Sequence, residues 1–222
     1  MRAIQAEMKR ESARGEFERA GRLRDQYFAL EKIAAHGVAA MPLSAPPQEY
    51  EAISQELSRL LQTTHPISRI EEFDVSNIQG KHAVGSMVVF VHGRPAPSLY
   101  RKFAIRGLAA PNDVAMMNEI VSRRLKHREW DMPDLLIVDG GRGQLSGALA
   151  AMRESALPRT FAIAALAKGK NELFVENRKD PIPLKTMSED LRNMLTRIKD
   201  EAHRFAVSFH RKRRSVDTLQ GA

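Results

Sequence analysis

The sequence predicts an α/β domain in which helices flank a mixed β-sheet, preceded by a small α-helical hairpin. Two observations indicate the sheet: three β-rich runs separated by turn residues begin at residue 69, and apolar runs that alternate with helical segments follow from residue 134. This order of strands, then strand and helix repeats, is typical of mixed sheets with helices packed on them. The 222 residues, 43% hydrophobic and 28% charged, are sufficient for the core of such a domain.

Residues 1–35 predict the helical hairpin, with two short helices separated at Gly15. In the second helix, apolar residues recur every three or four positions between 17 and 34 and form one stripe. A hairpin of this size cannot bury the stripe well by itself. Two interpretations stay open: a cap packed on the main domain, or a docking hairpin that pairs with the helices of a partner.

Residues 36–65 predict a linker and a connecting helix. Three prolines and several small residues between 36 and 48 indicate the linker. A helix with one apolar side follows, and His65-Pro66 ends it. The apolar side consists of Ile53, Leu57, Leu60 and Leu61.

Residues 66–215 predict the main domain, with the element order βββαβαβ(β)α. The first three strands are expected to form an antiparallel meander, with turns around Gly80 and at Gly93-Arg94-Pro95. Later runs that are apolar on both faces are typical of buried parallel strands. The elements after the meander are a helix at 111–130, a buried strand at 134–139, a helix at 144–155, a buried strand at 160–169, an edge strand at 172–175 and a long helix at 187–213; residues 216–222 form a tail.

The charge of the chain makes a polyanionic partner plausible. The formal net charge is +8, and it is distributed unevenly. Between residues 197 and 214, seven lysines and arginines stand against two acidic residues. Because basicity alone indicates nucleic acid only weakly, this concentration on one predicted helix is the more informative observation.

Composition and missing motifs exclude several classes of function. The chain has no cysteine, which excludes disulfides, a thiolate nucleophile and cysteine-ligated zinc or iron–sulfur clusters. No apolar run approaches the roughly 18 residues of a membrane span, and the charged N-terminus lacks a secretory signal, so we expect an intracellular protein. H-E-x-x-H and G-x-S-x-G are also missing. Metal-assisted hydrolysis is therefore the leading enzyme class.

Two aspartates and a histidine are the candidate catalytic residues. Asp74 lies in the first strand and Asp139 ends the first buried strand, so their carboxylates converge if these strands are neighbours. Two carboxylates beside a basic face suit a divalent cation and phosphodiester cleavage. His203, on the last helix beside its apolar stripe, can bind the metal or orient the attacking water.

Each of these residues also has an ordinary structural interpretation. Asp139 precedes two glycines, which is common turn chemistry. His203 can be a half-exposed helix histidine among basic residues. Asp113 stands near the start of a predicted helix, where an aspartate is a cap by default. Asp74 is harder to explain in this way, because a carboxylate buried in a β-rich run is costly unless it is paired or metal-bound.

A glycine-rich turn follows Asp139. The spacing of its glycines does not match G-x-G-x-x-G, and no P-loop motif is present, which argues against a nucleotide site. The turn opens a predicted helix, so its backbone N–H groups and Arg142 can still hold a phosphate.

Several motifs together resemble the C-terminal half of UvrC, an excinuclease component of bacterial nucleotide excision repair. The N-terminal run GEFERAGRLRDQ resembles the UVR motif that precedes this half, and the resemblance covers residues 1 to about 215 in the family's order. The motifs of the main domain are FDVSNIQG, VGSMVVFVHGRP leading into YRKF, PNDVAMM, LLIVDGGRGQL, ALAKG and RIKDEAHRFAVSFHRKRR.

The resemblance implies an RNase H-like fold and a metal-dependent endonuclease that makes the 5′ incision at damaged double-stranded DNA, in the cytoplasm. By matching motifs, Asp74, Asp139 and His203 would form an Asp-Asp-His site for Mg²⁺ or Mn²⁺, and Asp113 matches a further functionally important acid. The residues expected to contact DNA are Arg142, Lys168, Arg204, His210, Arg211, Lys212, Arg213 and Arg214. The hairpin would dock on a UvrB subunit through Phe17, Ala20, Leu23 and Arg24.

The sequence also departs from the family pattern. Complete members carry a GIY-YIG nuclease and tandem helix-hairpin-helix modules, and this sequence contains neither. A fragment and a naturally short relative both stay open. So does a different function, a non-catalytic module that binds DNA and docks on UvrB. A phosphate-holding small-molecule enzyme, indicated by the glycine turn alone, is a third and weaker alternative.

Overall fold

The computed structural model describes residues 7, 10, 11, 47–76, 83–105, 112–167, 169 and 171–219, with the backbone alone at 47–49, 76 and 208–219. Contacts divide the chain into two units, residues 1–47 and 48–222. The described residues of the predicted hairpin, Glu7, Arg10 and Glu11, are helical. The rest of that prediction lies outside the described residues.

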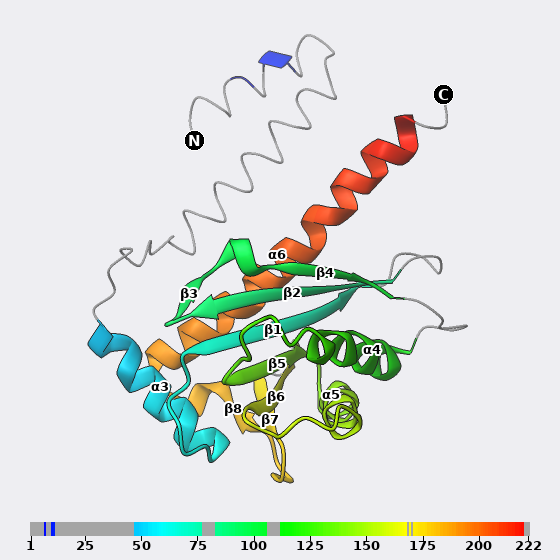
Figure 1. Cartoon of the computed structure of the whole chain (residues 1–222). Coiled ribbons are helices and arrows are strands. Elements are labelled where there is room, and N and C mark those ends of the chain that lie inside the picture. Colours follow the sequence, from blue (N-terminus) through cyan, green and yellow to red (C-terminus); the bar gives the residue numbers. More distant parts are fainter. Residues whose placement is uncertain are drawn as a thin grey trace. The chain divides into compact units, whose positions relative to one another are not determined.

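Eight strands form one mixed sheet in the described part of the second unit (Figure 1). Their order across the sheet is β3-β2-β1-β5-β6-β7-β8, and β4 also pairs with β2. β1, β5 and β6 run parallel, and all other pairs are antiparallel. The strands are β1 (Arg69–Ser76), β2 (Val84–Val91), β3 (Arg94–Pro95), β4 (Arg101–Ala104), β5 (Leu135–Asp139), β6 (Ala162–Ala167), β7 (Glu172–Val175) and β8 (Ile182–Pro183).

Helices cover both faces of this sheet. The helices are α3 (Pro47–Leu61), α4 (Asp113–Lys126), α5 (Arg142–Glu154) and α6 (Glu189–Leu219), with short 3-10 turns at Pro97–Leu99 and Leu184–Thr186. Because both faces are covered, β2, β5 and β6 are almost continuously buried, as expected for central strands. None of the described helices has both the length and the apolar character needed to cross a bilayer.

Contacts identify which helix lies on which face. A Cβ on Gly85 of β2 would lie 2.7 Å from Ile120 of α4, so Gly85 faces α4. The opposite face carries Lys102 of β4, because Lys102 pairs with Ser86, the residue after Gly85. The Lys102 ammonium lies 4.5 Å from the ring centroid of Phe205 on α6. α4 and α6 therefore pack on opposite faces, and α6 lies over β1 and β2 (Figure 1).

α3 is part of this second unit. Its Leu57 is fully buried, and the Tyr50 hydroxyl donates a hydrogen bond of 2.8 Å to the carbonyl of Ile67, just before β1. The backbone N–H of Ser188 donates to Glu56 of α3 at 3.0 Å, which joins this helix to the start of α6. The connecting helix predicted within 36–65 thus exists, begins at Pro47 and packs on the core.

Four element predictions were wrong in detail. Residues 94 and 95 form the short strand β3, because the turn comes one step earlier, at His92 and Gly93, both with positive φ. The strand at 172–175 lies inside the sheet because the unpredicted β8 pairs with it. α6 continues to Leu219, through residues 216–219 of the predicted tail.

The fourth correction concerns α4, which ends at Lys126 and not at 130. The helix ends here because of contacts with residues outside it. The Arg124 guanidinium donates to the carbonyls of His127 (3.3 Å) and Asp131 (2.6 Å), so the chain turns around this side chain. The Trp130 ring then stacks on His127, with ring centroids 4.0 Å apart.

Candidate active site at the carboxyl edge of the sheet

Asp74 and Asp139 lie side by side at the carboxyl ends of β1 and β5. The register places Phe73 opposite Val138, and each aspartate follows by one residue. Neighbouring strands are about 4.8 Å apart, so the two carboxylates share one small region of the sheet edge. The predicted site depended on β1 and β5 being neighbours, and the register shows that they are.

Both aspartates point to the face that α6 covers. Asp74 is opposite Ser86, and Ser86 is opposite Lys102, so all three share a face. Lys102 contacts Phe205, which identifies this as the α6 face. Asp139 also points this way, because Val138 shares the other face with Phe73 and successive strand residues alternate.

A third acid, Glu72, lies on the same face two residues before Asp74. Glu72 is 1% exposed and Asp74 is 5% exposed. Both carboxylate oxygens of Glu72, and Oδ1 of Asp139, are shielded from solvent. The buried Glu72 and Asp74 and the partly buried Asp139 concentrate negative charge on one face, which favours a cation or basic group nearby. Glu72 was not among the residues predicted from the sequence, although the alternation of a strand from Asp74 could have identified it.

His203 lies on α6 and is exposed. Ala202 is buried against the sheet, and Glu201 accepts a hydrogen bond from Tyr100 on the β4 side. One residue is a rotation of about 100° around a helix, so His203 occupies the opposite flank of α6, toward β5. In the described ranges, however, no three His, Asp or Glu side chains form a group that could hold a metal ion.

A hydrogen-bonded network fixes the turn of α6 that carries His203. The Tyr100 hydroxyl donates to Glu201 at 2.9 Å, and Arg204 donates to both oxygens of the same carboxylate at 2.6 Å. Phe205 meets the Tyr100 ring edge-on, with centroids 5.1 Å apart. Burial, with the Glu201 charge next, raises the pKa of Tyr100, and the hydrogen bond that Arg204 donates to Glu201 raises the pKa of Arg204.

Asp113 is the first residue of α4 and is exposed. Asn112 is the cap, since its side chain accepts a hydrogen bond of 3.1 Å from the Ala115 N–H. The next residue, Val114, packs closely on α5: a Cβ on Gly147 would lie 2.5 Å from the Val114 carbonyl oxygen. Because α5 starts just after Asp139, Asp113 lies at the same edge of the sheet, on the side of α4 and α5.

The glycine turn after β5 adopts a conformation that requires glycine. Gly140 has a φ of 136°, and its N–H donates to the carbonyl of Leu166 in β6 at 3.1 Å. The Gly141 N–H donates to the side chain of Gln144 at 3.0 Å. Arg142 donates to the carbonyls of residues 178 and 179 and lies 5.6 Å from the Phe174 ring centroid. Its guanidinium is thus directed toward the β7–β8 connection, and its contact with phosphate stays a prediction.

Several predicted contact residues cannot be placed by side chain. Lys168 and the hairpin residues Phe17, Ala20, Leu23 and Arg24 lie outside the described residues. The side chains of His210, Arg211, Lys212, Arg213 and Arg214 are also outside them, although the α6 backbone continues through these positions.

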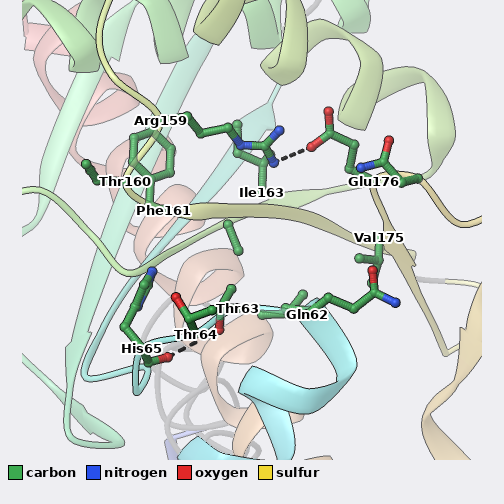
Figure 2. Close-up of a pocket in the computed structure, with 13 residues that line it drawn as sticks. Gln62, Thr63, Thr64, His65, Arg159, Thr160, Phe161, Ile163, Val175 and Glu176 are labelled. Atoms are coloured by element: carbon green, nitrogen blue, oxygen red, sulfur yellow. Dashed lines mark hydrogen bonds and ion pairs between the residues drawn. The ribbon is translucent and has the colours of Figure 1, made fainter.

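A separate cavity of about 510 Å³ opens at the other edge of the sheet (Figure 2). Figure 2 shows Arg159 ion-paired with Glu176 on one side and the segment 62–65 on the other. Phe161, at the amino end of β6, lies in its wall. The aspartates lie at the carboxyl ends of the strands, so this cavity is not part of the candidate active site.

Comparisons with known proteins identify the family of the chain. The family model described as the UvrC RNAse H endonuclease domain matches residues 58–207. This match confirms the predicted RNase H-like fold class and the resemblance to the C-terminal half of UvrC.

Two curated relatives, both UvrABC system protein C, match most of the chain. The relative from Desulforudis audaxviator is 38% identical over 221 residues, covering 91% of this chain and 35% of the relative. The relative from Dictyoglomus thermophilum is 46% identical over 162 residues, covering 72% of this chain and 27% of the relative. The chain thus spans about a third of the length of these relatives. Among solved structures, endonuclease V from Bacillus subtilis aligns only weakly, with a TM-score of 0.38 and 10% identity, over 76% of this chain and 95% of that chain.

Proposed function

The chain belongs to the UvrC family, in the part that holds the RNase H endonuclease domain, and on this premise we propose that it is a metal-dependent endonuclease that makes the 5′ incision at damaged DNA, together with a UvrB-like subunit. The observation that carries the proposal is the position of Asp74 and Asp139, side by side at the carboxyl ends of β1 and β5. Ligands of open α/β sheets collect at this edge.

The two carboxylates fit a hard divalent cation. Mg²⁺ and Mn²⁺ are commonly held by one or two carboxylates together with water and substrate phosphate oxygens. Asp74 and Asp139 would hold the ion, and when bound it would polarise the phosphate and make water a better nucleophile. His203, on α6, would either complete the ligand set or orient the attacking water.

Basic residues further along α6 would hold the DNA. Ala206 is the last side chain of this helix described as buried, and the helix continues thirteen residues to Leu219. At 1.5 Å per residue this continuation is about 20 Å long. It includes residues 211–214, which are Arg, Lys, Arg and Arg. A basic helix that begins at the site provides the electrostatic footprint expected for a phosphate backbone.

The decisive experiment is nicking of a lesion-bearing duplex that has already been incised on the 3′ side, with UvrA and UvrB supplied, in Mn²⁺. We expect wild type to nick on the 5′ side, and Asp74→Asn and Asp139→Asn to bind the DNA without nicking it. Asp131→Asn is the matched control, because Asp131 is exposed and lies at the other edge of the sheet. Nicking by both site variants at the wild-type rate would refute the assignment.

One observation favours the second candidate function, a non-catalytic module that binds DNA and docks on UvrB. Among the described residues, no three side chains form a complete metal group. This candidate predicts binding that weakens with salt by a slope of about 0.9 per phosphate contact and needs no metal. Metal-dependent nicking that is lost in Asp139→Asn would exclude it.

Docking on UvrB is proposed for the hairpin, residues 1–35, whose apolar stripe begins at Phe17. We expect Phe17→Ala to weaken binding of UvrB, measured by titration, and to leave metal-dependent cleavage unchanged. Glu18→Ala is the control, because Glu18 is the next residue and lies off the stripe. Equal affinity of Phe17→Ala and wild type would assign the hairpin to a cap on this chain.

A further inference from the structure

Tyr100 and Lys102 lie on the α6 face of the sheet and both contact the same turn of α6. Arg101, between them, points the other way, and its guanidinium lies 5.0 Å from the Trp130 ring centroid on the α4 side. Tyr100 donates to Glu201 and packs against Phe205. The Lys102 ammonium lies over the ring of Phe205, in a cation–π contact.

The register gives the height of this contact along the sheet. Lys102 is opposite Ser86, and Ser86 is opposite Asp74, so Lys102 lies level with the aspartate pair. Tyr100 directly precedes β4, and the same register extended by one residue places it level with Glu72. The turn of α6 held between Tyr100 and Lys102 therefore lies level with the buried acids.

The same contacts set the rotation of α6. Glu201 and Phe205 are held on the β4 side, and Ala202 and Ala206 are buried against the sheet. His203 is then directed to the remaining flank, toward β5, where Asp139 points to the same face. Rotation of the helix by one residue would turn the imidazole away from the acids.

We infer that Tyr100 is a positioning residue: its hydrogen bond to Glu201, with the Lys102–Phe205 contact, sets the height and rotation of α6 so that His203 faces Asp74 and Asp139. This inference rests on the proposed function. It assigns a role to the YRKF segment and to Glu201, which the catalytic site alone leaves unexplained. Displacing a catalytic group by about 1 Å can lower a rate a hundredfold, so a single hydrogen bond that fixes the position of α6 can matter for catalysis.

The test compares Tyr100→Phe with Tyr50→Phe. Each variant keeps its ring and loses one hydroxyl, and each hydroxyl makes one hydrogen bond, of 2.9 Å to Glu201 and 2.8 Å to the Ile67 carbonyl. Tyr50 contacts neither His203 nor the acids, so it controls for the general cost of losing such a bond. We expect Tyr100→Phe to lower kcat about tenfold with KM within twofold of wild type, and Tyr50→Phe to leave both unchanged. Equal kcat in the two variants would overturn the inference.

A second measurement does not depend on cleavage. The chain has seven histidines, and His203→Gln identifies the ring signal of His203 in an NMR spectrum. We expect Mn²⁺ to broaden that signal in wild type and in Tyr50→Phe, and less in Tyr100→Phe. Undiminished broadening in Tyr100→Phe would overturn the inference. If wild type fails to nick DNA but the broadening differs between the two variants, the proposed function fails and the positioning role stands.

Glu201 gives a test by rescue. Glu201→Gln keeps a side-chain oxygen that can accept from Tyr100, whereas Glu201→Ala removes it. We expect Glu201→Gln to retain most of kcat and Glu201→Ala to match Tyr100→Phe. A loss of equal size in Glu201→Gln and Glu201→Ala would contradict the role of the Tyr100 hydrogen bond.

Discussion

Replacing Arg124 by methionine should destabilise the sheet domain more than any surface change on the same helix. The Arg124 guanidinium donates to the Glu71 carboxylate through Nε at 2.7 Å and Nη2 at 2.9 Å, and both side chains are 0% exposed. The pair joins α4 to the middle of β1. Methionine keeps most of the side-chain volume, so the change removes charge and hydrogen bonds more than packing.

The expected loss of stability follows from the groups that lose Arg124 as a partner. Glu71 would keep only Arg69, at 2.9 Å, and the carbonyls of His127 and Asp131 would each lose the hydrogen bond from Arg124. Removing one partner of a buried ion pair costs about 3–5 kcal/mol. In a chain of this size, 1 kcal/mol corresponds to about 2–4 °C in Tm, so the expected fall in Tm is about 6–20 °C.

Urea unfolding followed by circular dichroism measures this difference. The control is Arg123→Met, one residue earlier, where the partly exposed arginine pairs with Glu119 on the same helix and donates to the Ala104 carbonyl. Surface pairs at this spacing are worth about 0.3–0.5 kcal/mol, so this variant should unfold close to wild type. A loss of less than about 1 kcal/mol in Arg124→Met would refute the reasoning. The double variant Glu71→Leu with Arg124→Met should recover part of the loss, because it also removes the buried carboxylate that loses Arg124 in the single variant.

Two further predictions concern close packing and pH. Gly147→Ala should cost about 1–3 kcal/mol in urea unfolding, because its Cβ would lie 2.5 Å from the Val114 carbonyl oxygen; Gly141→Ala, with no atom within 4 Å of its Cβ, is the control, and equal stability would contradict the prediction. Burial raises the pKa of Tyr50 and Tyr100. The folded state therefore favours their neutral forms, and this stability, full below about pH 10, is lost as the pH rises further. With three tyrosines in the chain, at most a third of the phenolate absorbance should appear near pH 10–11 while circular dichroism stays native; full titration of a native fold would contradict this.

The pattern of apolar residues was enough to predict the central strands, and it predicted that the two aspartates converge if their strands are neighbours. β5 is a short run that is apolar up to Asp139, and the carboxyl ends of neighbouring parallel strands meet at one edge. Residues 94 and 95 of β3 were assigned to a turn, and β8 was missed. Each strand has two residues, too few for any periodicity. Local sequence has no signal for such short strands.

Tertiary contacts decided what the sequence could not predict. Arg124 stands in the basic run SRRLK, which is typical of an exposed helix face, and only its partner 53 residues earlier makes it a core residue. The direction of His203 depends on Tyr100, about a hundred residues away along the chain. The rotation of a helix about its axis is determined by contacts with distant parts of the chain, and the spacing of residues in the sequence does not determine it.

The margins of the sheet have a consequence for self-association. Each end of the strand order is a two-residue strand that contains a proline, Pro95 in β3 and Pro183 in β8. Beside β3, the four-residue β4 carries Arg101 and Lys102. Proline offers no backbone N–H, and short, charged margins resist pairing with another chain. In its described part, the sheet is therefore protected against edge-to-edge aggregation.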